Sequence, residues 1–205
     1  MSDRFRWLMR DSGPRVAPWD VDLTASEAFA TVPSRGAIVE DWLLTLPRHA
    51  VINIASLART ERIALLAQAR DTAAVSNRSP HFTTFFEHGP VRVGTPAGCG
   101  VDHAHLHAVP LAFDLLEALP DDMGWHPVDM NDPWETLGGR DYLVIGCAST
   151  WLACEPQVPT SQFFRRQIAD AVTGGYGWDH NEHPWINNVR RTVDRFAARR
   201  RTAAP

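Results

Sequence analysis

The chain has 205 residues, and all 20 of its basic side chains are arginine because it contains no lysine. Lysine chemistry is therefore excluded, which removes Schiff bases with pyridoxal phosphate, lysyl-nucleotide intermediates and Walker-type phosphate loops. The net charge is −4, but residues 190–205 carry six arginines and one acid, so the acidic body is a poor non-specific partner for nucleic acids.

The first half of the chain alternates loops with short apolar runs. Residues 1–24 are loop-like, and residues 27–33 and 41–47 predict two strands. The second strand is apolar on both faces except at Thr45, which is typical of a central strand. From residue 56 to residue 75, apolar residues recur at steps of three and four, which predicts a helix.

The second half adds further strands and ends in helices. We expect strands at 81–87 and 101–110, a short helix at 113–119, a long acidic loop at 120–139, a hairpin at 142–146 and 151–154, and helices at 161–172 and 184–201. The fold class is then α+β, with an antiparallel five- to six-stranded sheet, a helix after the second strand and C-terminal helices.

The length predicts one domain, residues 1–205, with residues 1–24 as an N-terminal arm and residues 156–205 as a helical C-terminal extension. The arginine-rich end is expected to be a solvated helix end. Three cysteines without a CxxC pair argue against a disulfide scaffold, and no window reaches the length of a membrane span. We therefore expect a cytoplasmic protein with no membrane partner.

The segment that carries chemistry holds three histidines in strict alternation. His103, His105 and His107 alternate with small or aliphatic residues. In a strand, side chains two residues apart share one face, so the three imidazoles are expected on the same side. Each ring has two nitrogens that need partners, so three such rings do not favour a purely structural core role.

Two kinds of chemistry fit this pattern. A zinc site is one, but the outer histidines are about 13 Å apart along a strand, so one ion would need ligands from elsewhere. The other is covalent phosphoryl or nucleotidyl transfer, in which the middle histidine attacks phosphorus while its second nitrogen donates to a backbone carbonyl. The preceding glycine-rich loop can bring backbone N–H groups close to a phosphate, which makes Gly98, Cys99 and Gly100 candidate phosphate-binding residues.

The run from His103 to Val109 resembles the signature of the histidine triad (HIT) superfamily. Residues 32–49 and 86–89 resemble blocks that precede the triad in that superfamily, and residues 161–191 resemble the C-terminal extension of longer members related to dinucleoside polyphosphate phosphorylases. The resemblance implies a HIT-like fold and a two-step reaction through a nucleotidyl intermediate on His105. It also implies that His103 orients the site and that His107 contacts the α-phosphate.

Further site candidates come from the residues around these blocks. His88 lies at a strand end before Gly89 and is the next candidate for a phosphate or leaving-group contact. Glu87 stands where many members of the superfamily have asparagine, and there it could accept ribose hydroxyls or pair with a cation. The nucleoside pocket is expected at the end of the first strand, with Ser34, and near Trp42.

The expected function is therefore a nucleotidyl hydrolase or transferase that cleaves a nucleoside monophosphate from a phosphoanhydride or phosphoramidate. His107 at the third triad position favours hydrolysis or phosphorolysis over transfer to a hexose phosphate. The alternatives are a nucleotide-binding or regulatory protein with weak catalysis and a metal-dependent hydrolase. We expect a nucleotide as substrate, no cofactor, no bound metal and no nucleic-acid partner. The resemblance further implies a homodimer or larger homo-oligomer.

Overall fold

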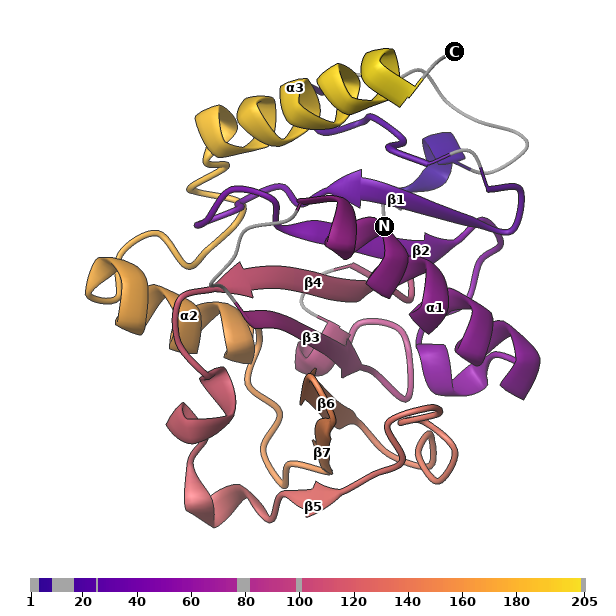
Figure 1. The fold of residues 1–205 in the computed structure, drawn as a ribbon. Helices are drawn as coiled ribbons and strands as arrows, with labels where there is room; N and C mark the ends of the chain where they lie inside the picture. The colour runs from indigo at the N-terminus through magenta and orange to yellow at the C-terminus, as the bar shows by residue number, and fades with distance from the viewer. Residues whose placement is uncertain (1–3, 9–16, 25, 77–81, 99–100, 204–205) are drawn as a thin grey trace.

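The computed structural model describes residues 4–8, 17–24, 26–76, 82–98 and 101–203 (Figure 1). Within them, an antiparallel sheet has the strand order β1-β2-β4-β3-β6-β7-β5. Its strands are β1 (Phe29–Pro33), β2 (Leu43–Pro47), β3 (Phe82–Gly89), β4 (Leu106–Leu111), β5 (His126–Pro127), β6 (Tyr142–Cys147) and β7 (Thr150–Cys154). The α-helices are α1 (Arg59–Ser76), α2 (Phe163–Thr173) and α3 (Ile186–Ala203).

The predicted α+β class, the helix after the second strand and the C-terminal helices are confirmed. The sheet has seven strands in the described part of the chain, one more than the upper end of the prediction. The additional strand is β5, a two-residue strand inside the expected acidic loop that pairs with β7. A two-residue strand has no periodicity that the sequence could reveal.

The two faces of the sheet carry two hydrophobic cores. Leu65, Leu66 and Ala69 of α1 belong to the core that contains Leu43 and Leu106. On the other face, α2 contributes to the core that contains Phe86 and Val109, and Val189 of α3 belongs to this second core. Helix α3 contacts β1 at the edge of the sheet (Figure 1). Helix α2 therefore borders the face opposite α1, whereas α3 lies at the β1 edge, contacts α1 and adds Phe196 to the core beneath α1.

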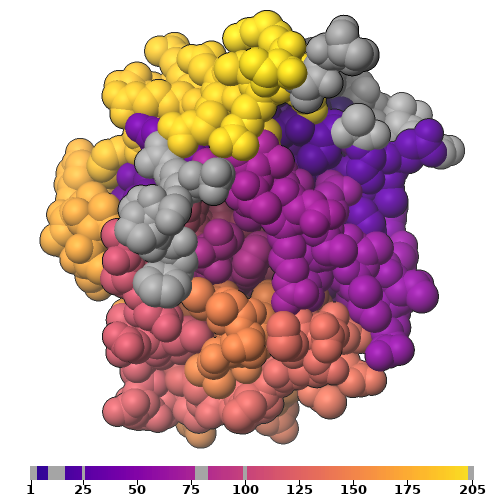
Figure 2. Space-filling view, viewed as in Figure 1, coloured from indigo at the N-terminus to yellow at the C-terminus, as the bar shows by residue number. Residues whose placement is uncertain are grey.

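The molecular surface follows the same arrangement. In the space-filling view, α3 forms the top and the segment around β5 forms the base, with α1 between them (Figure 2). Within the described residues, none of the helices combines the length and the apolar character that a bilayer crossing requires.

The acidic loop before β6 contributes to the core. Asp132 is fully buried and accepts two hydrogen bonds from Arg62 of α1, at 2.7 and 2.6 Å. Trp134 is also buried, and its indole N–H donates to Glu87 at 2.6 Å. The loop is thus held against α1 and β3 by charged and polar contacts that its composition alone does not indicate.

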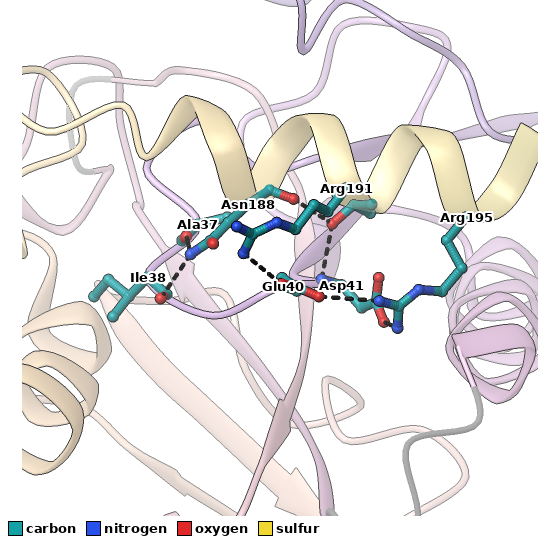
Figure 3. A network of polar contacts seen from close by, with 8 residues as sticks. Ala37, Ile38, Glu40, Asp41, Asn188, Arg191 and Arg195 are labelled. Carbon is teal, nitrogen blue, oxygen red and sulfur yellow. Dashed lines mark hydrogen bonds and ion pairs between the residues drawn. The ribbon is translucent and has the colours of Figure 1, made fainter.

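Helix α3 fixes the turn that leads into β2 (Figure 3). Arg195 pairs with both Glu40 and Asp41, at 2.9 and 2.6 Å, and Arg191 pairs with Glu40 at 2.8 Å. The backbone N–H of Asp41 donates to Thr192 Oγ1 at 2.8 Å. Arg191 stays mostly exposed, as expected for a solvated helix end, but Arg195 is half-buried, and both arginines neutralise a carboxylate pair in the turn before β2.

Candidate active site

The triad lies where the middle of the sheet meets the preceding loop. His107 belongs to β4, whereas His103 and His105 precede it, so the strand starts later than the predicted residue 101. The neighbouring strand β2 ends at Pro47, which has no N–H to extend the ladder. Alternation nevertheless persists, because Ala104, Leu106 and Ala108 all join the core beneath α1.

The rings of His105 and His107 lie close together, with centroids 4.9 Å apart. His105 Nδ1 lies 2.6 Å from the backbone oxygen of His103, and a carbonyl can only accept, so Nδ1 carries the proton. The indole N–H of Trp42 can only donate, and it lies 2.8 Å from His107 Nδ1, so that nitrogen is the acceptor. In their neutral forms, His105 therefore presents an unprotonated Nε2 and His107 presents an Nε2–H donor.

The other two histidines of this region are also held by backbone groups. His103 Nε2 donates to the carbonyl of Pro47 at 2.9 Å. His88 Nε2 accepts the N–H of Phe164 at the start of α2, at 3.4 Å. Phe86 pairs in register with His107 and stacks on its ring, with centroids 4.4 Å apart. The imidazoles are thus fixed in orientation by the sheet and by α2.

Burial keeps the imidazoles of His88, His105 and His107 neutral. It lowers the pKa of His105 to about 4 and that of His88 to about 3, and it holds the pKa of His107 well below its ordinary value. The nearby positive charge of Arg165 lowers all three pKa values further. At neutral pH, His105 Nε2 therefore keeps the lone pair that a nucleophile needs.

A small cavity of about 20 Å³ separates the triad from α2 and the segment that follows it. This volume holds about one water molecule, since one water needs roughly 10–15 Å³ of such space. Its lining contains no carboxylate: Arg4, Ser34, Leu44, His88, Val101, His105, His107, Gln162, Arg165 and His180. The two guanidinium groups and the imidazoles of this lining make a site suited to an anion.

Arg165 is the buried cation of this lining. Its guanidinium donates to Ser34 Oγ at 2.6 Å and to the backbone oxygens of Arg35 and Gly36, at 2.8 and 2.5 Å. It also lies 4.3 Å from the ring centroid of Trp42. Arg165 thus fixes the turn after β1 and the indole that donates to His107.

The N-terminal segment covers the triad. The ring of Phe5, only 1% exposed, lies 5.6 Å from that of His103 and 5.9 Å from that of His105, centroid to centroid. Phe5 and Leu8 belong to the core on this face. The sequence-based expectation of a loop or arm did not anticipate this contact, because no periodicity marks a single aromatic residue.

Replacing Phe5 with alanine is expected to expose His105. Losing a buried aromatic ring costs about 3–5 kcal/mol, which is enough to release a short terminal segment. We expect diethyl pyrocarbonate to modify His105 at least about tenfold faster in Phe5→Ala, since each 1.4 kcal/mol is a factor of ten. Peptide mass spectrometry measures the rate, and Arg6→Ala, an exposed change in the same segment, is the control. Equal rates in Phe5→Ala and the parent protein would refute the covering role.

The structure contradicts the expectation for Glu87. Strand β3 alternates, so His88 faces the triad while Glu87 points to the opposite face beneath α1. There its carboxylate accepts hydrogen bonds from the Ile54 N–H, Trp134 and Tyr142 at 2.8, 2.6 and 2.8 Å. Burial raises the pKa of Glu87 to about 7. Glu87 is a core residue and does not line the cavity beside the triad.

Ser34 and Trp42 lie at the site but in a different role from the one expected. Both are fully buried, Ser34 on Arg165 and Trp42 on His107, so neither offers an open face to a nucleoside. The expectation of a nucleoside pocket built from them is therefore wrong in this conformation. Gly98 is buried in the loop before the triad, and Cys99 and Gly100 lie outside the described residues.

Sequence reasoning missed the residues that the C-terminal extension adds to the cavity. Gln162, Arg165 and His180 line it although they lie more than 50 residues beyond the triad. Their only signal in the sequence is the resemblance of residues 161–191 to a family extension. Among the described residues, no three His, Cys, Asp or Glu side chains are placed to hold a metal ion.

The solved structures that are similar to this chain include two proteins of known fold. A hypothetical histidine triad nucleotide-binding protein from Sulfolobus tokodaii strain 7 has 15% sequence identity and a TM-score of 0.36, over 45% of this chain and 62% of that chain. Yeast Ap4A phosphorylase has 10% identity and a TM-score of 0.39, over 66% of this chain and 58% of that chain. The chain thus spans less than two thirds of either solved protein. No protein-family model and no curated protein sequence matches it.

Proposed function

We propose that the protein is a nucleotidyl hydrolase or transferase that releases a nucleoside monophosphate through a covalent intermediate on His105. The observation that carries this proposal is the opposite protonation of two adjacent rings. His105 offers a lone pair at Nε2 because its Nδ1–H is bound to the His103 carbonyl. His107 offers an Nε2–H donor because Trp42 occupies its Nδ1.

In the first step, His105 Nε2 attacks the α-phosphorus of the nucleotide. The new N–P bond forms while the bond from phosphorus to the leaving group breaks, and the leaving group departs with the electron pair. The imidazolium charge that develops on His105 is stabilised by the carbonyl of His103, which accepts its Nδ1–H at 2.6 Å. His107 Nε2–H and the Arg165 guanidinium supply positive potential for the phosphate oxygens.

In the second step, an acceptor attacks the same phosphorus and the N–P bond breaks. Water gives hydrolysis, and inorganic phosphate gives phosphorolysis. His105 recovers its neutral form with an unprotonated Nε2, and the proton of the attacking water leaves the site. The same lone pair and the same donors therefore serve both steps.

A nucleotide is far larger than the cavity of about 20 Å³, so the substrate has to displace part of its lining. On the N-terminal side, Arg4 lines the cavity and the neighbouring Phe5 packs on His105. We infer that this segment opens when the nucleotide enters. The tight closure also favours a second candidate function, a nucleotide-binding protein with slow turnover.

The test is a screen of the purified protein against dinucleoside polyphosphates and nucleoside phosphoramidates. Products are identified by mass, and samples quenched in alkaline denaturant are digested to find a nucleoside monophosphate on the peptide that contains His105. We expect turnover of at least one compound together with this adduct.

His49→Ala is the control, because His49 is an exposed histidine away from the cavity. Turnover of a verified substrate without any adduct on His105, or with the adduct on another residue, would refute the covalent mechanism. Tight binding of a nucleotide without turnover would support the second candidate function.

A further inference from the structure

His180 is a cavity histidine that lies 73 positions beyond His107 in the sequence. It belongs to the segment between α2 and α3, and only 7% of its surface is exposed. From the sequence alone, a surface or helix-capping role would be the simpler interpretation. Its burial beside His105 and His107 calls for a chemical explanation.

The orientation of the His180 ring is fixed by Gln162. The amide oxygen of Gln162 lies 2.8 Å from His180 Nδ1 and also accepts the backbone N–H of His180, at 3.3 Å. The amide nitrogen of Gln162 donates to Asp179 at 3.4 Å, which agrees with this assignment of the amide. A carbonyl oxygen can only accept, so Nδ1 of neutral His180 carries the proton and Nε2 does not.

The backbone around His180 is anchored on the turn after β1. Gly36 has a φ of +73°, and a Cβ at that position would approach His180 Cβ to 2.5 Å. Its N–H donates to the Pro184 carbonyl at 3.0 Å, and Arg35 donates to the Asn181 carbonyl at 3.1 Å. Gln162 itself has a φ of 56°, which is rare for a residue with a side chain. Such strain persists where surrounding contacts over-determine the conformation, as at functional sites.

We propose that His180 is the general base of the second step, accepting a proton at Nε2 from the water that releases the nucleotide from His105. This inference rests on the proposed function. The water oxygen bonds to phosphorus, the N–P bond to His105 breaks with its electrons returning to Nε2 of His105, and one water proton passes to His180. His180 then returns this proton to solvent.

The other histidines near the cavity are less suited to this role. His107 Nε2 carries a proton, and His88 Nε2 is occupied by the N–H of Phe164. His105 Nε2 is bonded to phosphorus in the intermediate. Within the described part of the lining, His180 is therefore the imidazole whose unprotonated nitrogen remains for the water.

Because of the surrounding charges, the pKa of His180 depends on whether a phosphate is bound in the cavity. Burial lowers the pKa of His180 to about 3, with further lowering by Arg165, Arg4 and Arg35, whereas Asp179 raises it. A bound phosphate offsets the arginine charges and raises the pKa of His180 toward the range of an effective base. In the empty site, His180 stays unprotonated at neutral pH and ready to accept.

The test separates the two chemical steps in the intact 205-residue chain. In His180→Gln, which keeps a polar side chain without a basic nitrogen, we expect the first release of leaving group at the parent rate. Release of the nucleotide from His105 should be about 10²–10⁴-fold slower, because that is the usual contribution of a general base. The adduct on His105 should therefore accumulate after a burst of leaving group. His183→Gln, a change in the same segment outside the cavity lining, should behave like the parent protein.

An adduct that turns over at the parent rate in His180→Gln would overturn the role of His180 while leaving the proposed function intact. Absence of the adduct from the parent protein and from every variant would instead refute the proposed function. If His180→Gln does not fold, ¹⁵N NMR spectra of the parent protein determine the tautomer of His180 and so test the inference. We expect Nδ1 of His180 protonated and Nε2 unprotonated, and the opposite tautomer would overturn the inference.

Discussion

His105→Ala is expected to lower kcat/KM for the substrate found in the screen by at least about 10⁴-fold, the scale seen when a nucleophile is removed. No neighbouring triad residue can replace it. His103 Nε2 donates to the Pro47 carbonyl, and His107 Nε2 carries a proton because Trp42 occupies Nδ1. Steady-state kinetics measure the loss, and mass spectrometry should find no adduct in the variant.

Two controls show whether the loss is chemical. Thermal unfolding of His105→Ala should stay close to that of the parent protein, because His105 is less buried than His103 and His107. Free imidazole should restore part of the activity by filling the space of the deleted ring. A variant that keeps the parent turnover, or that loses activity only because it unfolds, would contradict the role of His105 as nucleophile.

The alternation around the triad could be predicted because it depends only on strand geometry. Ala104, Leu106 and Ala108 pack beneath α1 as the pattern indicated, and His107 faces the opposite side. The pairing of β3 with β4 then places Phe86 beside His107. His88, two residues further along the same face of β3, reaches the site for the same reason.

The sequence could not show which of Glu87 and His88 faces the site. Both are polar residues at the end of a strand, and the register that separates them is set by contacts with β4 and β6. Trp134 and Tyr142, which bind the Glu87 carboxylate, lie 47 and 55 residues away. Because Glu87 is polar, the sequence suggested that it contacts a ligand, whereas the fold buries its carboxylate in the core.

The sequence also could not reveal the residues that reach the triad from distant segments of the chain. Phe5 contacts His103 and His105 from the N-terminal segment, while Arg165 and His180 approach from the C-terminal extension. Their contacts depend on how α2 and the N-terminal segment meet the sheet, which no local pattern encodes. Arg165 is informative here, because its place in the pair Arg165–Arg166 gives no hint that it is buried.

The second large effect that we expect is unfolding in mild acid. His88 and His180 have pKa values of about 3, His105 has one of about 4, and that of His107 is lowered well below normal, each chiefly by burial. The unfolded chain protonates the same side chains near pH 6.5, the ordinary histidine value. Folding stability from these four groups is therefore complete above about pH 6.5 and falls as the pH drops toward the folded pKa values.

Glu87 acts in the opposite direction. Its folded pKa of about 7 lies above the ordinary carboxyl value, so its contribution is complete below pH 4.5 and is lost as the pH rises toward 7. Between about pH 4.5 and 6.5, the unfolded chain can bind up to four extra protons on histidine, while the folded protein holds one extra on Glu87. The net difference of up to about three protons corresponds to a slope of about 4 kcal/mol per pH unit.

Since domains of this kind are stable by about 5–15 kcal/mol, such a slope predicts an acid-unfolding midpoint between roughly pH 3 and 5. Urea unfolding followed by circular dichroism at several pH values measures the slope. His88→Gln keeps an acceptor for the Phe164 N–H but cannot titrate, so it should reduce the slope by about one third, which is one proton of three. His49→Gln, a change at an exposed side chain, is the matched control variant. A stability that stays constant from pH 7 to 5 would show that the imidazoles around the cavity are not held neutral by the fold.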